Sequence, residues 1–285
     1  MACGVNKVYN SDTPMRKFAL FPLIAAALVA REPLATRIAH NDPAKYHHSP
    51  AVHDGAGSLD YMALFGADSL NTNLYFLHRG VIEPRSGIGA HFHNQCEEMF
   101  VIFDGEAQFT IDGRTSTLKG PAGALCRMGH SHAIYNATDK PVQWMNINVG
   151  RVKGKYDAFN LGDARTNAVL DEIPVFITMR LDKAGNTGYR RALPPEVFGT
   201  NWSYVDHVVI HAGATSQKER HEGVEEIYYV MDGAGTAHVN NETAPVQKGD
   251  AVPVLFTEMH SFENTGSSDL ELMVIGIART KFALQ

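Results

Sequence analysis

Short apolar runs separated by turn residues dominate the chain from about residue 70 onward. The clearest of them are Met99–Phe103, Ala107–Ile111, Val142–Val149, Ile227–Met231, Gly235–Val239 and Leu270–Ile277. Runs of this length, bounded by glycine, asparagine and aspartate, are typical of β-strands. Asp-Gly pairs at 104–105, 112–113 and 232–233 indicate hairpin turns between successive strands. Many short strands with glycine-rich turns predict an antiparallel sandwich or barrel.

The same pattern occurs twice along the chain. His93 and Glu98 have counterparts of their own type 128 positions later, in His221 and Glu226. The same offset links three further residues of the first copy to the second, in the pairs Gly105 and Gly233, His132 and His260, and Asn136 and Asn264. A constant offset over five matched residue types indicates two copies of one structural unit.

This repeat sets the expected domain boundaries. We expect an N-terminal segment over 1–55, a first barrel over 56–150, a connection with edge strands over 151–195 and a second barrel over 196–285. Within the connection, the apolar stretch Ile173–Leu181 predicts a first strand of the second barrel.

Residue types that bind metals gather in the first copy. His91 and His93 are two apart, which places both imidazoles on one face of a strand. After a turn, Glu98 can return its carboxylate toward them from the next strand, and His132 begins another strand-like segment. Three neutral imidazoles and one carboxylate suit Fe, Mn, Ni, Co, Cu or Zn, and they leave one or two positions open for water or substrate.

Two neighbouring residues compete for places in this set. His130 could replace His132, but its counterpart in the second copy is Glu258, whereas His132 is matched by a histidine. Glu97 could replace Glu98 if the strand register shifted by one residue, but the spacing to Gly105 favours Glu98.

At these positions the chain resembles the cupin family. Gly87-Ile88-Gly89-Ala90-His91-Phe92-His93, with Glu98 and Gly105 downstream, is similar to the first cupin motif, and Gly129-His130-Ser131-His132 with Asn136 is similar to the second. The second motif usually has proline where this chain has Arg127. The resemblance implies an all-β chain of two small jelly-roll barrels, each a double-stranded β-helix. It also implies a divalent metal inside the first barrel, held by His91, His93, Glu98 and His132.

The second copy departs from the motif at one ligand position. Glu219 stands where the first copy has His91, which leaves Glu219, His221, Glu226 and His260 as the candidate ligands. Two imidazoles and two carboxylates favour Mn or Fe. The alternative is that Glu219 turns outward beside Lys218 and Arg220 and that this barrel serves packing alone. We therefore expect one metal site in the first barrel, with a second site left open.

An open metal site allows several reactions. We expect a metal-dependent enzyme of dioxygenase type acting on a small organic molecule, with Fe, Mn, Ni, Cu or Zn as the metal. A non-redox lyase, isomerase or decarboxylase is the alternative, and a small-ligand-binding protein without catalysis is a further one. Glu98 is the expected general base as well as a ligand, and Tyr135 is a second candidate catalytic residue. Gln95, Trp144 and Asn146 are expected near the pocket wall, where ordinary packing is the alternative for Trp144 and for Tyr135.

Composition excludes some classes of partner. The net charge of −6 and the absence of a long basic run argue against nucleic acid. Three cysteines without a CxxC pair suggest neither a disulfide framework nor a thiolate zinc site. We expect a small-molecule substrate, no membrane span and a homodimer, since many cupins pair through their barrels.

The N-terminus allows two interpretations. Met15-Arg16-Lys17 followed by the apolar run Phe18–Ala30 is similar to a secretory signal, which would make the protein periplasmic or exported. A hydrophobic helix packed on the body of a cytoplasmic protein is the other interpretation. Further on, His40, His47, His48 and His53 are expected in a loop, with a lid over the site as a lesser alternative.

Overall fold

The computed structural model describes residues 31–163, 165, 169–170, 173, 178–181 and 188–281. Strands predominate in this part of the chain, which confirms the all-β prediction. The segment 15–30, for which a signal or a packed helix was expected, lies outside the described residues. The short helix α1 (Leu34–Arg37) and the 3₁₀ turns Pro43–Lys45, Val52–Asp54 and Pro195–Val197 supplement the strands.

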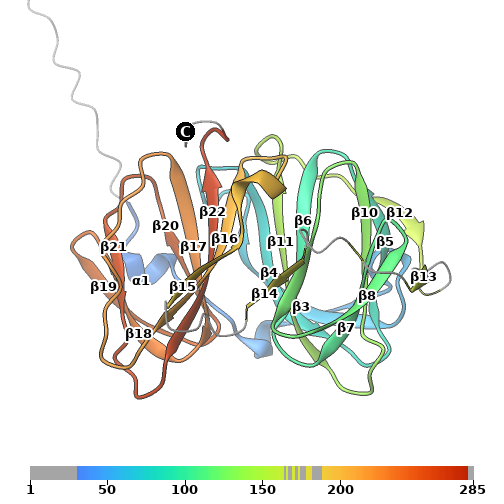
Figure 1. Cartoon of the computed structure of the whole chain (residues 1–285), viewed down its shortest axis with the longest axis horizontal. Coiled ribbons are helices and arrows are strands. Elements are labelled where there is room, and N and C mark those ends of the chain that lie inside the picture. The colour runs from blue at the N-terminus through green and yellow to red at the C-terminus, as the bar shows by residue number, and fades with distance from the viewer. Residues whose placement is uncertain are drawn as a thin grey trace, which may run out of the picture. The chain divides into compact units, whose positions relative to one another are not determined.

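The first barrel consists of two sheets (Figure 1). The larger has the order β14-β9-β6-β11-β4-β3-β2. Its strands are β2 (His47–Pro50), β3 (Ser58–Gly66), β4 (Leu74–Ile82), β6 (Cys96–Ile102), β9 (Ala122–Cys126), β11 (Val142–Gly150) and β14 (Thr178–Arg180). The other has the order β12-β5-β10-β7-β8-β13. Its strands are β5 (Gly87–His93), β7 (Glu106–Ile111), β8 (Arg114–Lys119), β10 (His130–Tyr135), β12 (Phe159–Gly162) and β13 (Val169–Leu170).

The second barrel repeats this plan with fewer strands. Its larger sheet has the order β1-β20-β17-β22-β16-β15, with β1 (Ala39–His40), β15 (Tyr189–Leu193), β16 (Trp202–Ile210), β17 (Val224–Asp232), β20 (Asp250–Val254) and β22 (Leu270–Ala278). The smaller sheet has the order β19-β18-β21, with β18 (Ala234–Val239), β19 (Glu242–Gln247) and β21 (His260–Glu263).

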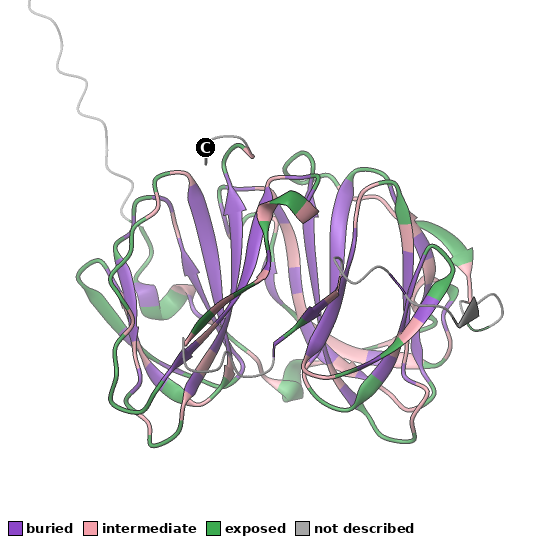
Figure 2. Ribbon diagram, in the orientation of Figure 1, coloured by how far each residue is buried: buried purple, intermediate pink, exposed green. Residues whose placement is uncertain are grey.

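The two larger sheets are buried on both of their faces. One hydrophobic cluster contains Met99 and Val101 of β6 together with Ile227 of β17 and Met273 and Ile275 of β22, so it joins the outer faces of both large sheets. Figure 2 shows this buried layer in the central strands, with the exposed residues concentrated in the outer loops. Burial on both faces explains why these strands are continuous apolar runs in the sequence rather than alternating ones.

Only one of the three Asp-Gly pairs closes a hairpin. Asp112-Gly113 connects β7 and β8, which pair with each other. The other two predictions were wrong, because β6 does not pair with β7, nor β17 with β18. These turns carry the chain from one sheet to the other, and the local dipeptide cannot distinguish a crossover from a hairpin.

The segments before each barrel are exchanged. β1 precedes the first barrel but pairs with β20 of the second, with Ala39 opposite Ala251. β14 precedes the second barrel but pairs with β9 of the first, with Met179 opposite Gly123. The prediction that Ile173–Leu181 begins the second barrel was therefore wrong for β14, the strand within this stretch. β15 is the strand that leads into β16. The apolar residues of β14 complete the first core instead, because Met179 is buried there.

Two buried carboxylates join the barrels reciprocally. Glu97 accepts hydrogen bonds from the backbone N–H of Gly199 (2.6 Å) and of Thr200 (2.9 Å), just before β16. Its counterpart Glu225 accepts from the backbone N–H of Thr72 (2.8 Å) and the side chain of Asn71, just before β4. Thr72 and Thr200 are 128 positions apart, as are the two carboxylates, so the repeat includes the contact between the barrels.

We expect Glu97→Gln to destabilise the protein. Each of the two buried N–H groups donates to its own carboxylate oxygen, and glutamine replaces one of these oxygens with an NH₂ group that cannot accept a hydrogen bond. The expected loss is about 1–3 kcal/mol of unfolding free energy, seen as a lower midpoint of urea unfolding. Glu106→Gln, at an exposed position at the start of β7, is the matched control and should leave the midpoint unchanged. Equal midpoints for the two variants would contradict this role of Glu97.

Candidate metal centre

Three strands bring four predicted ligands together. His91 and His93 lie on β5, Glu98 on β6 and His132 on β10, and all four are almost completely buried. β10 pairs with β5 so that His132 is directly opposite His91. The two-residue period of β5 then places His91 and His93 on the same inner face.

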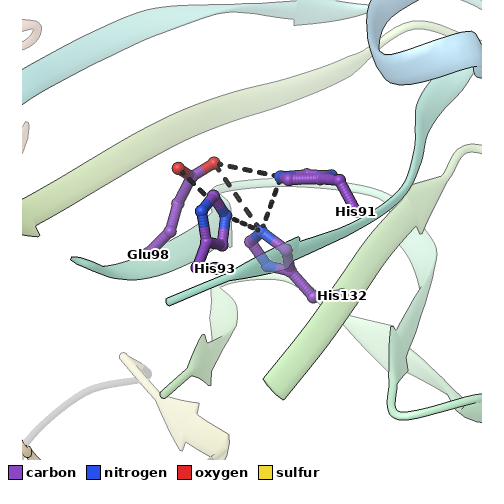
Figure 3. Close-up of side chains that lie close together, drawn as sticks. All are labelled: His91, His93, Glu98 and His132. Atoms are coloured by element: carbon purple, nitrogen blue, oxygen red, sulfur yellow. Dashed lines mark hydrogen bonds and ion pairs between the residues drawn. The ribbon is translucent and has the colours of Figure 1, made fainter. Parts of the chain in front are cut away.

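The donor atoms converge on one point (Figure 3). Nε2 of His132 lies 3.0 Å from Nε2 of His91 and 3.1 Å from Nε2 of His93. The carboxylate oxygens of Glu98 lie 3.5 to 3.8 Å from the three Nε2 atoms.

Hydrogen bonds fix the tautomers of two of these rings. Nδ1 of His91 lies 2.8 Å from the carbonyl oxygen of Gly89, and Nδ1 of His93 lies 2.6 Å from that of Asp157. A carbonyl only accepts, so both rings carry their proton on Nδ1 and present a lone pair at Nε2. Lone pairs on nitrogens this close repel one another unless a cation lies between them. The four residues therefore fit a divalent metal ion.

Two asparagines of β11 hold the carboxylate of Glu98. The side-chain amide of Asn146 donates to Oε1 (2.8 Å), and that of Asn148 donates to Oε2 (2.7 Å). Burial alone would raise the pKa of Glu98, but the neighbouring imidazoles, His93 above all, hold it well below its usual range. Burial lowers the pKa of His93 and that of His132. Glu98 is thus held as a carboxylate, and His93 and His132 as neutral imidazoles, the form that binds a metal.

Aromatic rings and a short cover enclose the ligands. Phe100 stacks on His132 with ring centroids 4.2 Å apart, and His53 stacks on His91 at 3.9 Å. Nδ1 of His53 lies 2.7 Å from the side-chain oxygen of Asn160, whose amide donates to Asp54. Segments 53–54 and 160 thereby form a covering layer over β5.

The competing candidates lie elsewhere. His130 is exposed and bonds to Asp112 through Nδ1 (2.6 Å). Glu97 is turned to the other face of β6, toward the second barrel.

The residues expected at the pocket wall lie in different places. Asn146 and Trp144 lie on the inner face of β11 with the ligand cluster, although Gln95 is exposed. Tyr135 is not brought to the cluster. Its ring is covered by the guanidinium of exposed Arg165, 5.2 Å from the ring centroid. The structure gives Tyr135 no contact that supports a catalytic role.

The histidines expected in an N-terminal loop lie mostly on strands. His40 belongs to β1 and bonds to Asp250 at 2.7 Å, and His47 and His48 belong to β2. The loop prediction was wrong for these three, because the pairing of β1 with β20 and of β2 with β3 overrides the local turn signals of the prolines. His53 lies in the turn Val52–Asp54 against His91.

The second copy assembles its candidates only in part. Glu219, His221 and His260 have donor atoms within 4.8 Å of one another. Oε1 of Glu226 accepts from the hydroxyl of Tyr204 (2.6 Å) and Oε2 from that of Tyr228 (3.1 Å). The carboxylate that corresponds to Glu98 is therefore already bonded within the chain.

A family comparison matches both halves of the chain. The cupin domain model matches residues 78–148 and again 206–276, two segments that are 128 positions apart. The chain belongs to the cupin family. It is a bicupin, with one cupin domain in each barrel.

Comparisons with curated proteins cover parts of this bicupin. An oxalate-binding protein of Thermotoga maritima is 40% identical over 63 residues, which are 22% of this chain and 52% of that protein. The chain thus spans about half the length of this relative. An uncharacterized protein of Methanocaldococcus jannaschii is 28% identical over 103 residues, 36% of this chain and 78% of that protein.

Solved structures share the two-barrel fold. Oxalate decarboxylase of Bacillus subtilis superposes with a TM-score of 0.60 at 16% identity, over 85% of this chain and 76% of that chain. Salicylate 1,2-dioxygenase of Pseudoaminobacter salicylatoxidans gives 0.60 at 15% identity, over 76% and 73%. Identities this low establish the fold alone.

Two residues of the site were not predicted from the sequence. Asn148 contacts the ligand cluster and His78 faces it, yet each lies in a segment with no motif of its own. His53, for which a lid over the site was the lesser alternative, stacks on His91. Only Asn148 leaves a signal, because it stands two residues after Asn146 on a strand and so shares its face. Separately, no helix in the described part of the bicupin is long and apolar enough to span a bilayer.

Asn148→Ala should weaken metal binding by about 10–100-fold, because supporting hydrogen bonds of this kind orient a ligand and tune its affinity. The measurement is competition with a chelator of known affinity. Asn94→Ala, at an exposed position of the same barrel, is the control. Equal affinities in the two variants would show that Asn148 does not position Glu98.

Acid should destabilise the metal-free protein partly through His78. Burial lowers the pKa of His78 to about 4, from the 6.5 of an unfolded chain. Below pH 6.5 the unfolded chain therefore binds a proton that the folded chain rejects, so stability falls as the pH drops toward 4. His78→Phe should flatten this decline, measured as urea midpoints at several pH values. Exposed His48→Phe should keep the wild-type slope, and a wild-type slope in both variants would refute the assignment.

Proposed function

We propose that this bicupin is a metal-dependent oxidoreductase of dioxygenase type, acting on a small organic molecule with a flat, conjugated body. The observation that carries the proposal is the surface beside the metal ligands. Directly opposed residues of paired strands project to the same side, so the inner face of the large sheet is known from its register.

That inner face leads from the ligands to the edge of the barrel. Asn148 pairs with Phe76, and Asn146 pairs with His78, which places both rings beside the Glu98 carboxylate and its two amides. Tyr61 on β3 packs against His78, and His47 on β2 packs against Tyr61, with ring centroids 5.1 and 4.1 Å apart. The surface thus becomes more exposed as it runs from β6 to β2.

This surface is aromatic and carries no fixed positive charge. Phe76 stacks on His78 at 4.1 Å, and the described inner face from β6 to β2 presents neither lysine nor arginine. A small dianion such as oxalate would meet no cationic side chain there, whereas a flat conjugated ring or enol can stack on the wall. The wall therefore favours an aromatic or dicarbonyl substrate.

The chain's own residues have distinct roles in this proposal. His91, His93, Glu98 and His132 would hold the metal, which supplies open positions for substrate and oxygen when it is bound. Asn146 and Asn148 keep Glu98 oriented, and Phe100 fixes the plane of His132. No described residue hydrogen-bonds to the ring of His78, which is neutral at pH 7 because of its low pKa. Its ring nitrogen can accept a hydrogen bond from a substrate hydroxyl.

A second candidate is a non-redox decarboxylase or lyase. It is favoured by the match to the oxalate-binding protein and by the fold shared with oxalate decarboxylase, for which Mn(II) centres are described. Such an enzyme would work without oxygen and with Zn as well as with a redox metal.

Oxygen consumption separates the two candidates. Protein loaded with Fe, Mn, Ni or Cu should consume oxygen in step with loss of a catechol, hydroxybenzoate or dicarbonyl substrate from a panel. His93→Ala should lower the rate by about 100-fold or more, since an imidazole ligand is lost. His221→Ala, in the second barrel, is the matched control and should retain the rate. Undiminished turnover under strict anaerobiosis would refute the dioxygenase proposal and favour the decarboxylase or lyase.

A further inference from the structure

A cavity lies inside the second barrel. The cavity has a volume of about 630 Å³, within the range of small-molecule sites. Tyr204, Glu226, Tyr228 and His260 form its floor, and Glu219 and His221 lie at its partly exposed side. This space corresponds, through the repeat, to the interior that holds the metal ligands in the first barrel.

One hydroxyl distinguishes the two barrels at the centre. Tyr228 stands 128 positions after Phe100, and its hydroxyl lies 2.7 Å from Nε2 of His260 and 3.1 Å from Oε2 of Glu226. In the first barrel, Phe100 lies flat on His132 at an interplanar angle of 2° and leaves Nε2 open. In the second, the ring of Tyr228 is tilted 61° to His260. Its hydroxyl contacts both donor atoms that a metal would use, and it donates its single proton to Glu226 while His260 lies on its other side.

A second difference between the barrels supports the first. Val274 and Gly276 of the second barrel take the positions of Asn146 and Asn148, so the second barrel lacks the two amides that hold Glu98 in the first. The hydroxyl of Tyr204 replaces them by donating to Oε1 of Glu226. Gly276 makes this exchange feasible, because a Cβ there would lie 2.3 Å from Cζ of Tyr204. Both carboxylates therefore accept two hydrogen bonds inside the chain. Glu226 differs from Glu98 because one of its donors, Tyr228, also contacts His260 at the place where a metal would bind.

We propose that the Tyr228 hydroxyl closes the second barrel to metal and that the remaining chamber binds a small organic cation, a protonated amine on an apolar or aromatic body. The proposal does not depend on the dioxygenase function, because it concerns a separate cavity and a different class of ligand.

The charges that line the chamber favour a cation. Three carboxylates face it, those of Asp206, Glu219 and Glu226, whereas Arg191 is the single lysine or arginine among the lining residues. Arg191 is already bonded to Asp206, with Nη2 3.2 Å from Oδ2. Glu226 is 3.2 Å from Nε2 of His260. Glu219 is the carboxylate left for a ligand.

The geometry around Glu219 places it beside a ring nitrogen that has no hydrogen-bond partner among the described residues. Its backbone pairs with that of His260 through two hydrogen bonds of 3.0 and 2.9 Å, which fixes where its side chain begins. Its Oε2 lies 3.7 Å from Nε2 of His221, which is also 3.6 Å from Oε2 of Glu226 and makes no hydrogen bond to any described residue. An ammonium group there would donate to Glu219, and also to His221 when that ring carries its proton on Nδ1.

The walls suit the rest of such a ligand. Tyr189, Tyr204, Tyr228 and Phe262 contribute aromatic surface. The guanidinium of Arg191 lies 4.2 Å from the ring centroid of Tyr204, so this wall already binds one cation through its π face.

Metal stoichiometry tests the first half of the proposal. Elemental analysis after loading with excess Mn or Zn and desalting should give one ion per chain for wild type and a second ion for Tyr228→Phe. Tyr229→Phe removes a hydroxyl from the other face of the same strand, where it accepts a hydrogen bond from Arg79, and should stay at one. A wild-type chain with two ions, the second lost in His221→Ala, overturns the proposal. So does a Tyr228→Phe variant that remains at one.

Calorimetric titration of the metal-loaded protein tests the second half. The probe is 2-phenylethylamine, compared with neutral 2-phenylethanol and anionic 3-phenylpropionate. The amine should bind saturably and at least about tenfold more tightly than the other two. Glu219→Gln should weaken it about tenfold or more, whereas exposed Glu222→Gln should not. His91→Ala, which empties the first barrel, should leave amine binding intact. Absence of saturable amine binding, or its loss in His91→Ala, overturns the proposal.

Discussion

The interior of the first barrel is organised around the convergence of three imidazole nitrogens and one carboxylate on a single point. Two imidazoles whose Nδ1 protons are committed to carbonyl oxygens present Nε2 lone pairs within 3.1 Å of a third imidazole nitrogen, in a space almost closed to water. The carboxylate beside them is held by two amides, which are neutral and leave its negative charge in place. A bound cation would be shared by all four groups, and β5, β6, β10 and β11 bring them to one point.

The second barrel shows how little is needed to change that arrangement. The backbone frame is retained, since Asn264 donates to the carbonyls of Ile210 and Ser268 as Asn136 does to those of Ile82 and Lys140. What differs is the location of the polar atoms. In the first barrel, two amides on β11 hold Glu98, and the rings opposite them carry no hydroxyl. In the second, the rings opposite Val274 and Gly276 carry hydroxyls, and these donate to Glu226.

Much of this could be predicted from the sequence because it is periodic. Strand alternation and the constant offset located His91, His93, Glu98 and His132, and they located the strands that carry them. What depends on pairing between distant segments could not be predicted. Asn148 supports Glu98 only because β11 lies beside β6, and β14 joins the first barrel rather than the second. The catalytic role expected of Tyr135 stays a prediction, and the contact of its ring with Arg165 is another that depends on distant segments.

The exchange of β1 and β14 has a topological consequence. Each barrel is completed by a strand that belongs, by chain order, to the other, and each presents a buried carboxylate to the loop that opens the other. If the chain were cut between the barrels, each half would still lend its first strand, β1 or β14, to the other half. This is the geometry of a domain-swapped dimer with pseudo-twofold symmetry. Because the two barrels are joined in one chain, their association is intramolecular. Its effective concentration does not depend on the concentration of the protein, so dilution does not separate the barrels.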